Sequence, residues 1–408
     1  MNFDIVIVGS GQAGFQTAAS LRQEGFDGSI AIVGDEPGLP YQRPPLSKTY
    51  LKEGVADRLY FRDAGFFETN RILLEDGARV AAVNRHDKQV KLEDGRSFGY
   101  GHLVLATGAR NRRLPIEGID LDGVVDLRTL ADADAFRATL PSVKRLAVIG
   151  GGFIGLEIAA TARAMGAEVT VLEATDRLMS RVVSPPVSAH FLEAHTAAGI
   201  DVRLHTMGSR IFGSDGRASG VELQDGDTVA ADLVLVAAGV VANAELAEAA
   251  GLYVHDGIRV DDVMATEDPD ISAIGDCASF PFGHDGLQTR LESVQNAVDQ
   301  AKCLAKRLTG KPERYAALPW FWSDQGPDKL QIAGLAVGAD HYEQHSAGDG
   351  KLTVLCFRRD ELIGVETVNT PADHMAARKL LASDTPITLE EARSTGFDVA
   401  ALFRARKG

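Results

Sequence analysis

Two glycine-rich turns in a single chain constrain its fold more than any other feature. GSGQAG at residues 9–14 follows the apolar run DIVIV, and GGGFIG at residues 150–155 follows RLAVI. In this pattern the first glycine allows a tight turn, the second lets the backbone approach a pyrophosphate, and the third lets a helix pack close to its strand. Glycine-rich turns are common in loops, but a strand before and a helix after each turn indicate a dinucleotide cradle. The repeat predicts two dinucleotide-binding units about 140 residues apart.

The first turn contains Gly9, Gly11 and Gly14, and Gly25 is expected to end the helix that follows it. The free N–H groups and the positive end of this helix are expected to face phosphates. Asp35 lies in the next predicted strand, 29–36, and 24 residues after Gly11. Its carboxylate is expected to accept hydrogen bonds from a ribose.

The second turn contains Gly150, Gly152 and Gly155, and Glu173 ends the strand that follows the helix. A carboxylate at this place accepts hydrogen bonds from a ribose 2′-hydroxyl and repels a 2′-phosphate. The sequence therefore predicts a preference for NADH over NADPH. Arg177, four residues further on, is the one nearby side chain that could weaken this preference.

Strand and helix patterns alternate over most of the first 310 residues, which predicts an α/β fold. After residue 315 the pattern changes: 351–369 alternates and reverses around RRDE, as an antiparallel hairpin does. Thr370 is then expected to cap a helix that has Pro371 at its first position. We therefore predict two Rossmann-like dinucleotide-binding domains, followed by a C-terminal α+β domain.

Composition narrows the functional classes. A net charge of −15 over 408 residues argues against a nucleic-acid binder and against adhesion to an anionic membrane. No targeting segment and no apolar run long enough to cross a bilayer is visible, so a cytoplasmic location without membrane association is expected. No metal-binding spacing is found either.

The number and spacing of the cysteines argue against two kinds of redox centre. The chain has three, Cys277, Cys303 and Cys356, without a CxxC or a cluster. They cannot fully ligate an iron–sulfur cluster that needs four, or form the close redox pair of a disulfide reductase, and structural roles are expected.

Two nicotinamides in one chain would have little to exchange, whereas a resident flavin can accept hydride from a visiting nicotinamide. FAD and NADH are thus the expected cofactors.

At this point the sequence resembles a known family. The two glycine turns, LVLATGAR (103–110) and ISAIGDCA (271–278) are similar to the FAD-dependent pyridine-nucleotide reductases of the glutathione-reductase type. Four further motifs resemble the narrower group of putidaredoxin reductase and the ferredoxin reductases of ring-hydroxylating dioxygenases: YQRPPLSKTYL (41–51), LRTLADA (127–133), LESVQNA (291–297) and PWFWSDQ (319–325). The resemblance covers nearly the whole chain.

The resemblance implies that the NADH domain is inserted into the FAD domain. The FAD domain would comprise 1–108 and 236–314, and the NADH domain 109–235. The C-terminal domain, 315–408, would lie near the flavin and near the docking site of the electron acceptor.

The resemblance also implies residues for each part of FAD. Ala13 would lie over the pyrophosphate and Lys48 close to the flavin. Asp276, which is expected to end a strand at the carboxyl edge of the sheet, would lie on the ribityl chain. The backbone of Val294 would point at the flavin pyrimidine, where a helix dipole stabilises developing negative charge. Arg43 would lie towards the nucleotide end of FAD, and Val80 would contact the adenine through its backbone. Arg128 would approach FAD from the inserted domain.

Two further roles follow from the resemblance. Glu157 would reach the nicotinamide and pair with Lys48; otherwise it is an acid favoured at a helix N-terminus. Trp322 would lie against the flavin, although large aromatics are commonly core residues. RPPLSK, which contains Lys48, also has an alternative reading as a rigid surface turn.

With no cysteine pair to receive them, the electrons are expected to leave for a separate one-electron acceptor. The resemblance implies a [2Fe–2S] ferredoxin that supplies a cytochrome P450 or a ring-hydroxylating dioxygenase. Such ferredoxins are acidic, so a local cationic face is expected, with Arg62, Arg290 and Lys302 as candidate docking residues or, alternatively, as ordinary solvated charges.

Other functions compete with this one. A reductase of rubredoxin or of another acceptor differs only in its partner. An NADH oxidase or peroxidase typically carries an early redox cysteine, and none precedes Cys277. A flavin-binding signalling protein similar to apoptosis-inducing factor would be expected to carry a targeting sequence or a basic surface.

Overall fold

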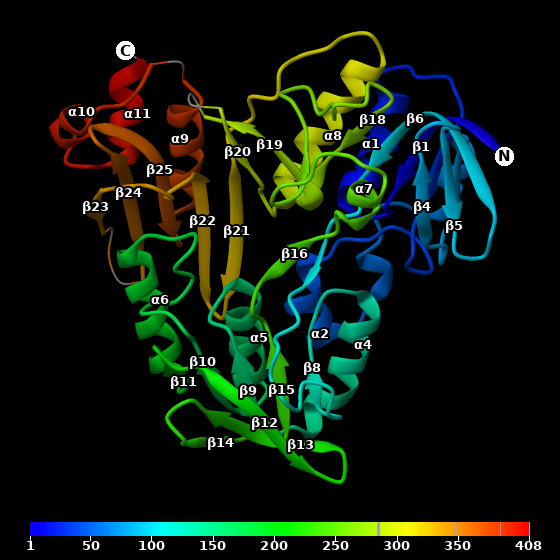
Figure 1. Cartoon of the computed structure of the whole chain (residues 1–408). Helices are drawn as coiled ribbons and strands as arrows, with labels where there is room; N and C mark the ends of the chain where they lie inside the picture. The colour runs from blue at the N-terminus through cyan, green and yellow to red at the C-terminus, as the bar shows by residue number, and fades with distance from the viewer. Residues whose placement is uncertain (284–285, 347, 349, 384, 408) are drawn as a thin grey trace. The chain divides into compact units, whose positions relative to one another are not determined.

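The computed structural model describes residues 1–283, 286–346, 348, 350–383 and 385–407. The chain forms two compact units, each assembled from three segments (Figure 1). The first unit comprises 1–42, 56–110 and 240–317, and the second comprises 43–55, 111–239 and 318–408. The segment 43–55 thus groups with the second unit, as does the C-terminal part, and our assignment of FAD and NADH to residue ranges stays a prediction.

The first unit is built on a seven-stranded sheet. Its order is β3 (Ile72–Glu75), β2 (Ile30–Val33), β1 (Asn2–Val8), β6 (Ser97–Leu105), β5 (Gln89–Leu92) and β4 (Val80–Asn84), with β18 (Ile271–Ala273) also paired to β6. The strands β1, β2, β3, β6 and β18 pair in parallel, whereas β4, β5 and β6 form an antiparallel meander. Residues 5–8 of β1 are all apolar and buried, as expected for a strand covered on both faces.

Two helices, α1 (Gln12–Gln23) and α8 (Val294–Leu308), pack against each other in this unit. Gly25 follows α1 with φ of +86°, the left-handed conformation that ends many helices. Ser293 caps α8, and its hydroxyl accepts a hydrogen bond from the N–H of Asn296. The smaller elements are α3 (Ala64–Thr69), α7 (Glu245–Ala249), β17 (Ile258–Arg259), β19 (Ala278–Phe282) and β20 (Leu287–Thr289).

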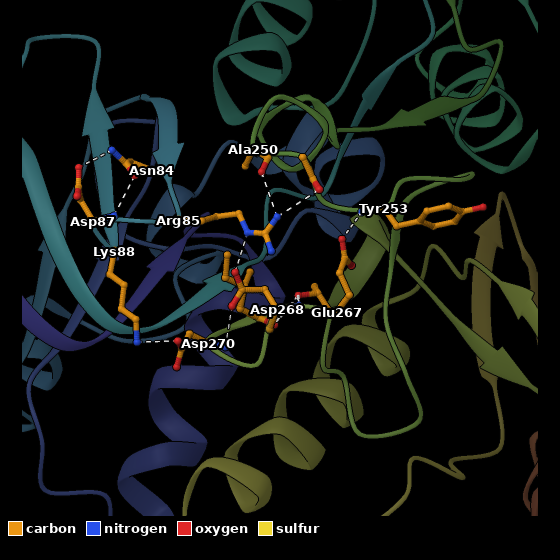
Figure 2. A network of polar contacts seen from close by, with 12 residues as sticks. Asn84, Arg85, Asp87, Lys88, Ala250, Tyr253, Glu267, Asp268 and Asp270 are labelled. Carbon is orange, nitrogen blue, oxygen red and sulfur yellow. Dashed lines mark hydrogen bonds and ion pairs between the residues drawn. The ribbon is translucent and has the colours of Figure 1, made fainter.

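Arg85 and Lys88, in the turn between β4 and β5, form polar contacts with the segment 250–270, which precedes β18 (Figure 2). The Nε of Arg85 donates to Asp268 at 2.7 Å, and one Nη lies 3.4 and 3.3 Å from the carbonyl oxygens of Ala250 and Gly251. Lys88 forms an ion pair with Asp270 at 2.6 Å. These contacts fix the segment that leads directly into β18.

The second unit contains a five-stranded parallel sheet. Its order is β11 (Asp201–Arg203), β10 (Glu168–Leu172), β9 (Arg145–Ile149), β15 (Leu233–Val236) and β8 (Val124–Val125). The helices of this part are α2 (Thr49–Glu53), α4 (Leu130–Thr139), α5 (Phe153–Ala164) and α6 (Pro185–Ala197). A three-stranded sheet consists of β12 (Gly208–Ser214), β13 (Arg217–Leu223) and β14 (Thr228–Ala230). The short strands β7 (Ala109–Asn111) and β16 (Val240–Ala242) pair with each other where the chain leaves and re-enters the first unit.

The C-terminal part of the second unit is an antiparallel sheet with helices. The strand order is β21 (Trp320–Gln325), β22 (Asp328–Gly334), β25 (Glu361–Val368), β24 (Leu352–Arg358) and β23 (His341–His345), and the helices are α9 (Pro371–Leu381), α10 (Leu389–Ser394) and α11 (Val399–Lys407). The hairpin predicted around RRDE is β24–β25. The predicted fold class, two Rossmann-like halves and a C-terminal α+β part, is confirmed.

Three local predictions differ from the structure. β2 ends at Val33, so Asp35 lies in the loop after the strand. β18 ends at Ala273, and Asp276 belongs to a 3₁₀ turn, Gly275–Cys277. Thr370 stands at the N-cap of α9, but its side chain does not cap the helix, because its hydroxyl lies 3.1 Å from that of Thr353.

No helix in the described residues is long and apolar enough to cross a membrane.

Candidate functional site

The first glycine turn has room for a ligand only at its centre. Gly9 has φ of +111°, and a Cβ there would overlap the carbonyl oxygen of Ala106. A Cβ at Gly14 would overlap the carbonyl oxygen of Gly9, so the first and third glycines are required by packing. A Cβ at Gly11, in contrast, would have no neighbour within 4 Å. The open position of Gly11 beside the N-terminus of α1 fits the pyrophosphate of a dinucleotide.

Three of the predicted FAD residues lie around this turn in the first unit. A Cβ at Gly275 would lie 3.0 Å from that of Ala13 and 3.8 Å from that of Ala297. The turn that holds Asp276 therefore approaches both α1 and the first turns of α8, which begins at Val294. The fully buried Gln300 accepts the N–H of Gly275 at 2.7 Å. Its amide nitrogen has no partner among the described residues, and such a buried donor suits a bound ligand or water.

Asp35 and Val80 occupy neighbouring segments of the first unit. The N–H of Ala78 donates to the carbonyl of Gly34 at 2.8 Å, which ties the loop after β2 to the start of β4. The Asp35 side chain is 60% exposed and lies 3.9 Å from Arg79, a neighbour that sequence reasoning did not identify. The backbone of Val80, and not its buried side chain, is what can face a nucleotide here.

The second glycine turn repeats this geometry in the second unit. Gly150 has φ of +113°, and a Cβ at Gly155 would overlap the carbonyl oxygen of Gly150. A Cβ at Gly152 would again have no neighbour within 4 Å. The Glu173 carboxylate accepts the N–H of Gly151 at 2.8 Å and that of Thr175 at 2.8 Å. Glu173 therefore anchors the glycine turn itself, beside the place where a ribose is expected.

Arg177 is held by its own loop. One Nη donates to the carbonyl of Val183 at 2.7 Å and lies 3.3 Å from the Ser188 hydroxyl, while the other donates to the carbonyl of Ser180 at 2.6 Å. With these bonds the guanidinium ties together the segment after Glu173. The side chain that could have weakened the preference for NADH is thus engaged in a structural role.

Glu157 is the centre of a buried polar cluster in the second unit. Its side chain is 5% exposed, and Oε2 lies 2.8 Å from Nζ of Lys48. Oε2 also accepts the hydroxyl of Ser47 at 2.5 Å, and Oε1 accepts the hydroxyl of Ser323 at 2.6 Å. The structure brings Lys48 and Glu157 together as predicted. Sequence reasoning missed both serines, although each belongs to a quoted motif, RPPLSK or PWFWSDQ.

Arg43 and Arg128 also meet in this unit. One Nη of Arg43 donates to the backbone carbonyl of Arg128 at 2.6 Å. The N–H of Arg128 lies 3.1 Å from the Asp132 carboxylate, which completes a capping box with Thr129 at the start of α4. The two arginines predicted to approach FAD are therefore neighbours, held by the start of one helix.

Trp322 is half-buried on β21, and its ring stacks on that of Trp320 at 5.7 Å between centroids. The guanidinium of Arg378 lies 4.3 Å from the centre of the Trp320 ring. Trp320 thus belongs to the packing of α9 on the C-terminal sheet, whereas Trp322 remains the candidate for the flavin.

The three predicted docking cations have different surroundings. Arg290 is 11% exposed and forms ion pairs with Asp256 at 3.1 Å and Glu292 at 2.5 Å, which argues against a docking role. Lys302 is 54% exposed and pairs with Asp299 at 3.3 Å. Arg62 is exposed and lies over the ring of Phe66 at 5.8 Å. Arg62 and Lys302 remain candidates.

The three cysteines are buried and unbridged. Burial raises the pKa of the Cys303 thiol to about 11, and it also raises the pKa of Cys277. These thiols are therefore protonated at neutral pH, which fits packing and not redox chemistry.

Comparison with known proteins defines the class. Residues 3–301 match the family described as pyridine nucleotide-disulphide oxidoreductase, and residues 320–403 match the reductase C-terminal family. The chain belongs to the pyridine nucleotide-disulphide oxidoreductases, and its cofactors are FAD and a nicotinamide dinucleotide.

Individual relatives resemble it over nearly their whole length. Rhodocoxin reductase from Rhodococcus erythropolis is 52% identical over 406 residues, which cover 99% of this chain and 95% of that protein. The ferredoxin reductase of the CYP199A2 system from Rhodopseudomonas palustris is 48% identical, with a TM-score of 0.94 over 97% of this chain and 99% of that one. A covalent putidaredoxin reductase–putidaredoxin complex contains a chain that is 39% identical, with a TM-score of 0.95 over 100% of this chain and 99% of that one.

Proposed function

We propose that this chain is an NADH-dependent FAD flavoprotein that delivers electrons to a [2Fe–2S] ferredoxin supplying a cytochrome P450 or a ring-hydroxylating dioxygenase. The observation that carries the proposal is the pair of glycine turns, each packed at its first and third glycines and open at Gly11 or Gly152. One chain thereby offers two separate dinucleotide cradles.

FAD, when bound, accepts a hydride from the nicotinamide and passes the electrons on singly. The residues of this chain bind and orient the two dinucleotides. Gly11 admits the FAD pyrophosphate, Gly152 admits that of NADH, and Glu157, fixed by Lys48, orients the nicotinamide. Positioning of this kind converts an encounter of two reactants into an effectively unimolecular step.

The preference for NADH rests on Glu173 and Arg177. A carboxylate beside the glycine turn favours a ribose 2′-hydroxyl over a 2′-phosphate. Arg177, with its guanidinium bound to Val183 and Ser180, does not offset that charge at the ribose.

The choice of acceptor is supported by the relatives, whose names include rhodocoxin reductase and a ferredoxin reductase of a P450 system. The described cysteines are buried, single thiols, so the electrons leave the protein instead of reducing a disulfide within it. A rubredoxin is the alternative acceptor on the same scaffold. The proposed location is the cytoplasm.

The test is the reduction of purified [2Fe–2S] ferredoxins by the isolated yellow protein, with NADH in one arm and NADPH in the other. Ferredoxin reduction with NADH, slower with NADPH, is expected. Parallel arms with rubredoxin and with oxygen alone distinguish the other acceptors. A colourless protein that cannot take up FAD, or a bound flavin that stays oxidised in excess NADH, would overturn the proposal.

A further inference from the structure

Strand β21 presents one face of alternate residues to the nucleotide-binding part of the second unit. Phe321 packs edge-on against Phe153, the first residue of α5, at 4.9 Å between ring centroids. Two residues on, Ser323 contacts Glu157 of α5, and Gln325 contacts His195 of α6. Side chains separated by two residues share a face of a strand, so this face is directed at the helices that follow the second glycine turn.

The hydrogen bonds of this face run in one direction, from His195 through Gln325 and Ser323 to Glu157. The Oε1 of Gln325 can only accept, so Nε2 of His195, 2.8 Å away, is its donor. Burial lowers the pKa of His195, and the ring is a neutral donor at pH 7. The amide nitrogen of Gln325 lies 3.2 Å from the Ser323 hydroxyl and 3.3 Å from the sulfur of Met179.

The direction of these hydrogen bonds determines which atom the Ser323 hydroxyl donates to. Because Gln325 donates to the Ser323 oxygen, the single hydroxyl hydrogen of Ser323 is left for Oε1 of Glu157, 2.6 Å away. Ser323 and Gln325 are 0% and 3% exposed, so water does not compete for these bonds. Met179 in turn donates its N–H to the carbonyl of Gly151 at 3.0 Å, which connects these hydrogen bonds to the glycine turn.

The donors that bind Glu157 among the described residues leave one acceptor position of its carboxylate open. A carboxylate offers about four lone-pair sites. Lys48 and Ser47 occupy Oε2, and Ser323 occupies one site of Oε1. The remaining site of Oε1 can accept one N–H group, such as that of the nicotinamide carboxamide.

We propose that Ser323 and Gln325, on the C-terminal strand β21, are positioning residues for nicotinamide binding: they orient the Glu157 carboxylate so that its remaining lone pair receives the carboxamide. This role deepens the proposed function and depends on it. It assigns to the C-terminal part a task in the reaction with NADH, in addition to any part in acceptor docking.

The experiment compares the FAD-loaded wild type with Ser323→Ala, Ser323→Thr and Gln325→Leu. The affinity for NAD⁺ is measured by titration calorimetry, and flavin reduction by NADH is followed in a stopped-flow instrument. In Ser323→Ala both the NAD⁺ affinity and the reduction rate are expected to fall by roughly 10- to 100-fold, the range for a lost hydrogen bond to a charged group. Ser323→Thr, which keeps the hydroxyl, restores most of both. Gln325→Leu lowers both by about 3- to 10-fold, since the Ser323 hydroxyl can then rotate.

Ser184→Ala is the matched control, because Ser184 also donates to a buried glutamate, Glu366, between the same two parts of the unit. It is expected to lower the melting temperature and to leave NAD⁺ affinity and flavin reduction unchanged. Equal losses in Ser184→Ala and Ser323→Ala, or unchanged NAD⁺ affinity in Ser323→Ala and Gln325→Leu, would sink the positioning role. A wild type whose flavin NADH does not reduce contradicts the proposed function instead, which keeps the two failures apart.

Discussion

The ammonium of Lys48 lies 2.8 Å from Oε2 of Glu157, and the two side chains are only 18% and 5% exposed. Lys48 follows the 3₁₀ turn Pro44–Ser47, and its Nζ also donates to the carbonyl of Pro44 at 3.2 Å. Ion pairs removed from water are costly unless their remaining donors and acceptors are satisfied. Here two serine hydroxyls and a backbone carbonyl satisfy most of them, and one acceptor site of Glu157 is left for a ligand.

This pair predicts a strong coupling between two substitutions. Glu157→Gln leaves the Lys48 ammonium partly buried without its counter-charge, and we expect a loss of roughly 1–3 kcal/mol in the free energy of unfolding. Lys48→Met leaves the carboxylate with the two serines and is expected to cost about as much. The double variant should lose less than the sum, by about 1–2 kcal/mol, in urea unfolding of the holoprotein. Strictly additive losses would mean that the pair does not interact.

Substitutions in the first glycine turn should distinguish an effect on cofactor binding from an effect on folding. Gly11→Ala places its methyl group in open space, so the chain should fold, but the methyl group should exclude the FAD pyrophosphate. Gly14→Ala overlaps the Gly9 carbonyl and should instead reduce the yield of soluble protein. Flavin content per folded protein, measured by absorbance and circular dichroism, distinguishes the two.

The second turn provides the corresponding pair for NADH. Gly152→Ala should retain FAD while raising the NADH KM at least tenfold, whereas Gly155→Ala should destabilise the fold, because its Cβ overlaps the Gly150 carbonyl. Normal NADH kinetics in Gly152→Ala would show that the nucleotide lies elsewhere.

The preference for NADH is expected to depend on Glu173 and not on Arg177. Glu173→Ala removes the charge that repels a 2′-phosphate, and we expect kcat/KM for NADPH relative to NADH to rise by about tenfold. Arg177→Gln should leave this ratio unchanged and lower the melting temperature, because its guanidinium holds Val183 and Ser180. A changed ratio in Arg177→Gln would place that side chain at the ribose.

The sequence predicted the parts of the site that are local. The glycine turns, the acid after each and the helix of Val294 lie within short segments whose geometry depends on neighbouring residues. The hydroxyls on Glu157 come from residues 110 and 166 positions away, and no spacing rule connects them. The ion pair of Arg290 with Asp256 was not foreseen for the same reason, because the two residues are 34 positions apart. Tertiary packing also draws the Thr370 hydroxyl away from its helix to Thr353.

Docking of the ferredoxin should depend on exposed cations. Arg62→Glu and Lys302→Glu are expected to raise the ferredoxin KM by about three- to tenfold and to leave NADH–ferricyanide activity intact, because rim charges mainly affect association. Arg290→Gln should act on stability, because it leaves Asp256 and Glu292 without their partner. If ferricyanide reduction falls as much as ferredoxin reduction in the first two variants, these residues do not belong to the docking face.

A buried carboxyl in the C-terminal sheet predicts how stability varies with pH. Glu366 on β25 is 0% exposed, and its oxygens accept the N–H of Ser184 at 3.0 and 3.1 Å and the Ser184 hydroxyl. Burial raises its pKa from an ordinary 4.5 to about 7, against the opposing effects of Ser184 and of Arg177. Cys356 on the adjacent strand β24 also faces it.

The sign of the effect follows from the direction of this shift. The folded chain holds the Glu366 proton more tightly than the unfolded chain does, so its contribution to stability is complete below about pH 4.5 and is lost as the pH rises through about 7. Glu366→Gln cannot ionise, and its stability should fall less than that of the wild type between pH 5 and pH 8. Urea midpoints at the two pH values measure this, with the exposed Glu390→Gln as the control that keeps the wild-type slope. Parallel curves for Glu366→Gln and the wild type would mean that Glu366 does not change its protonation over this range.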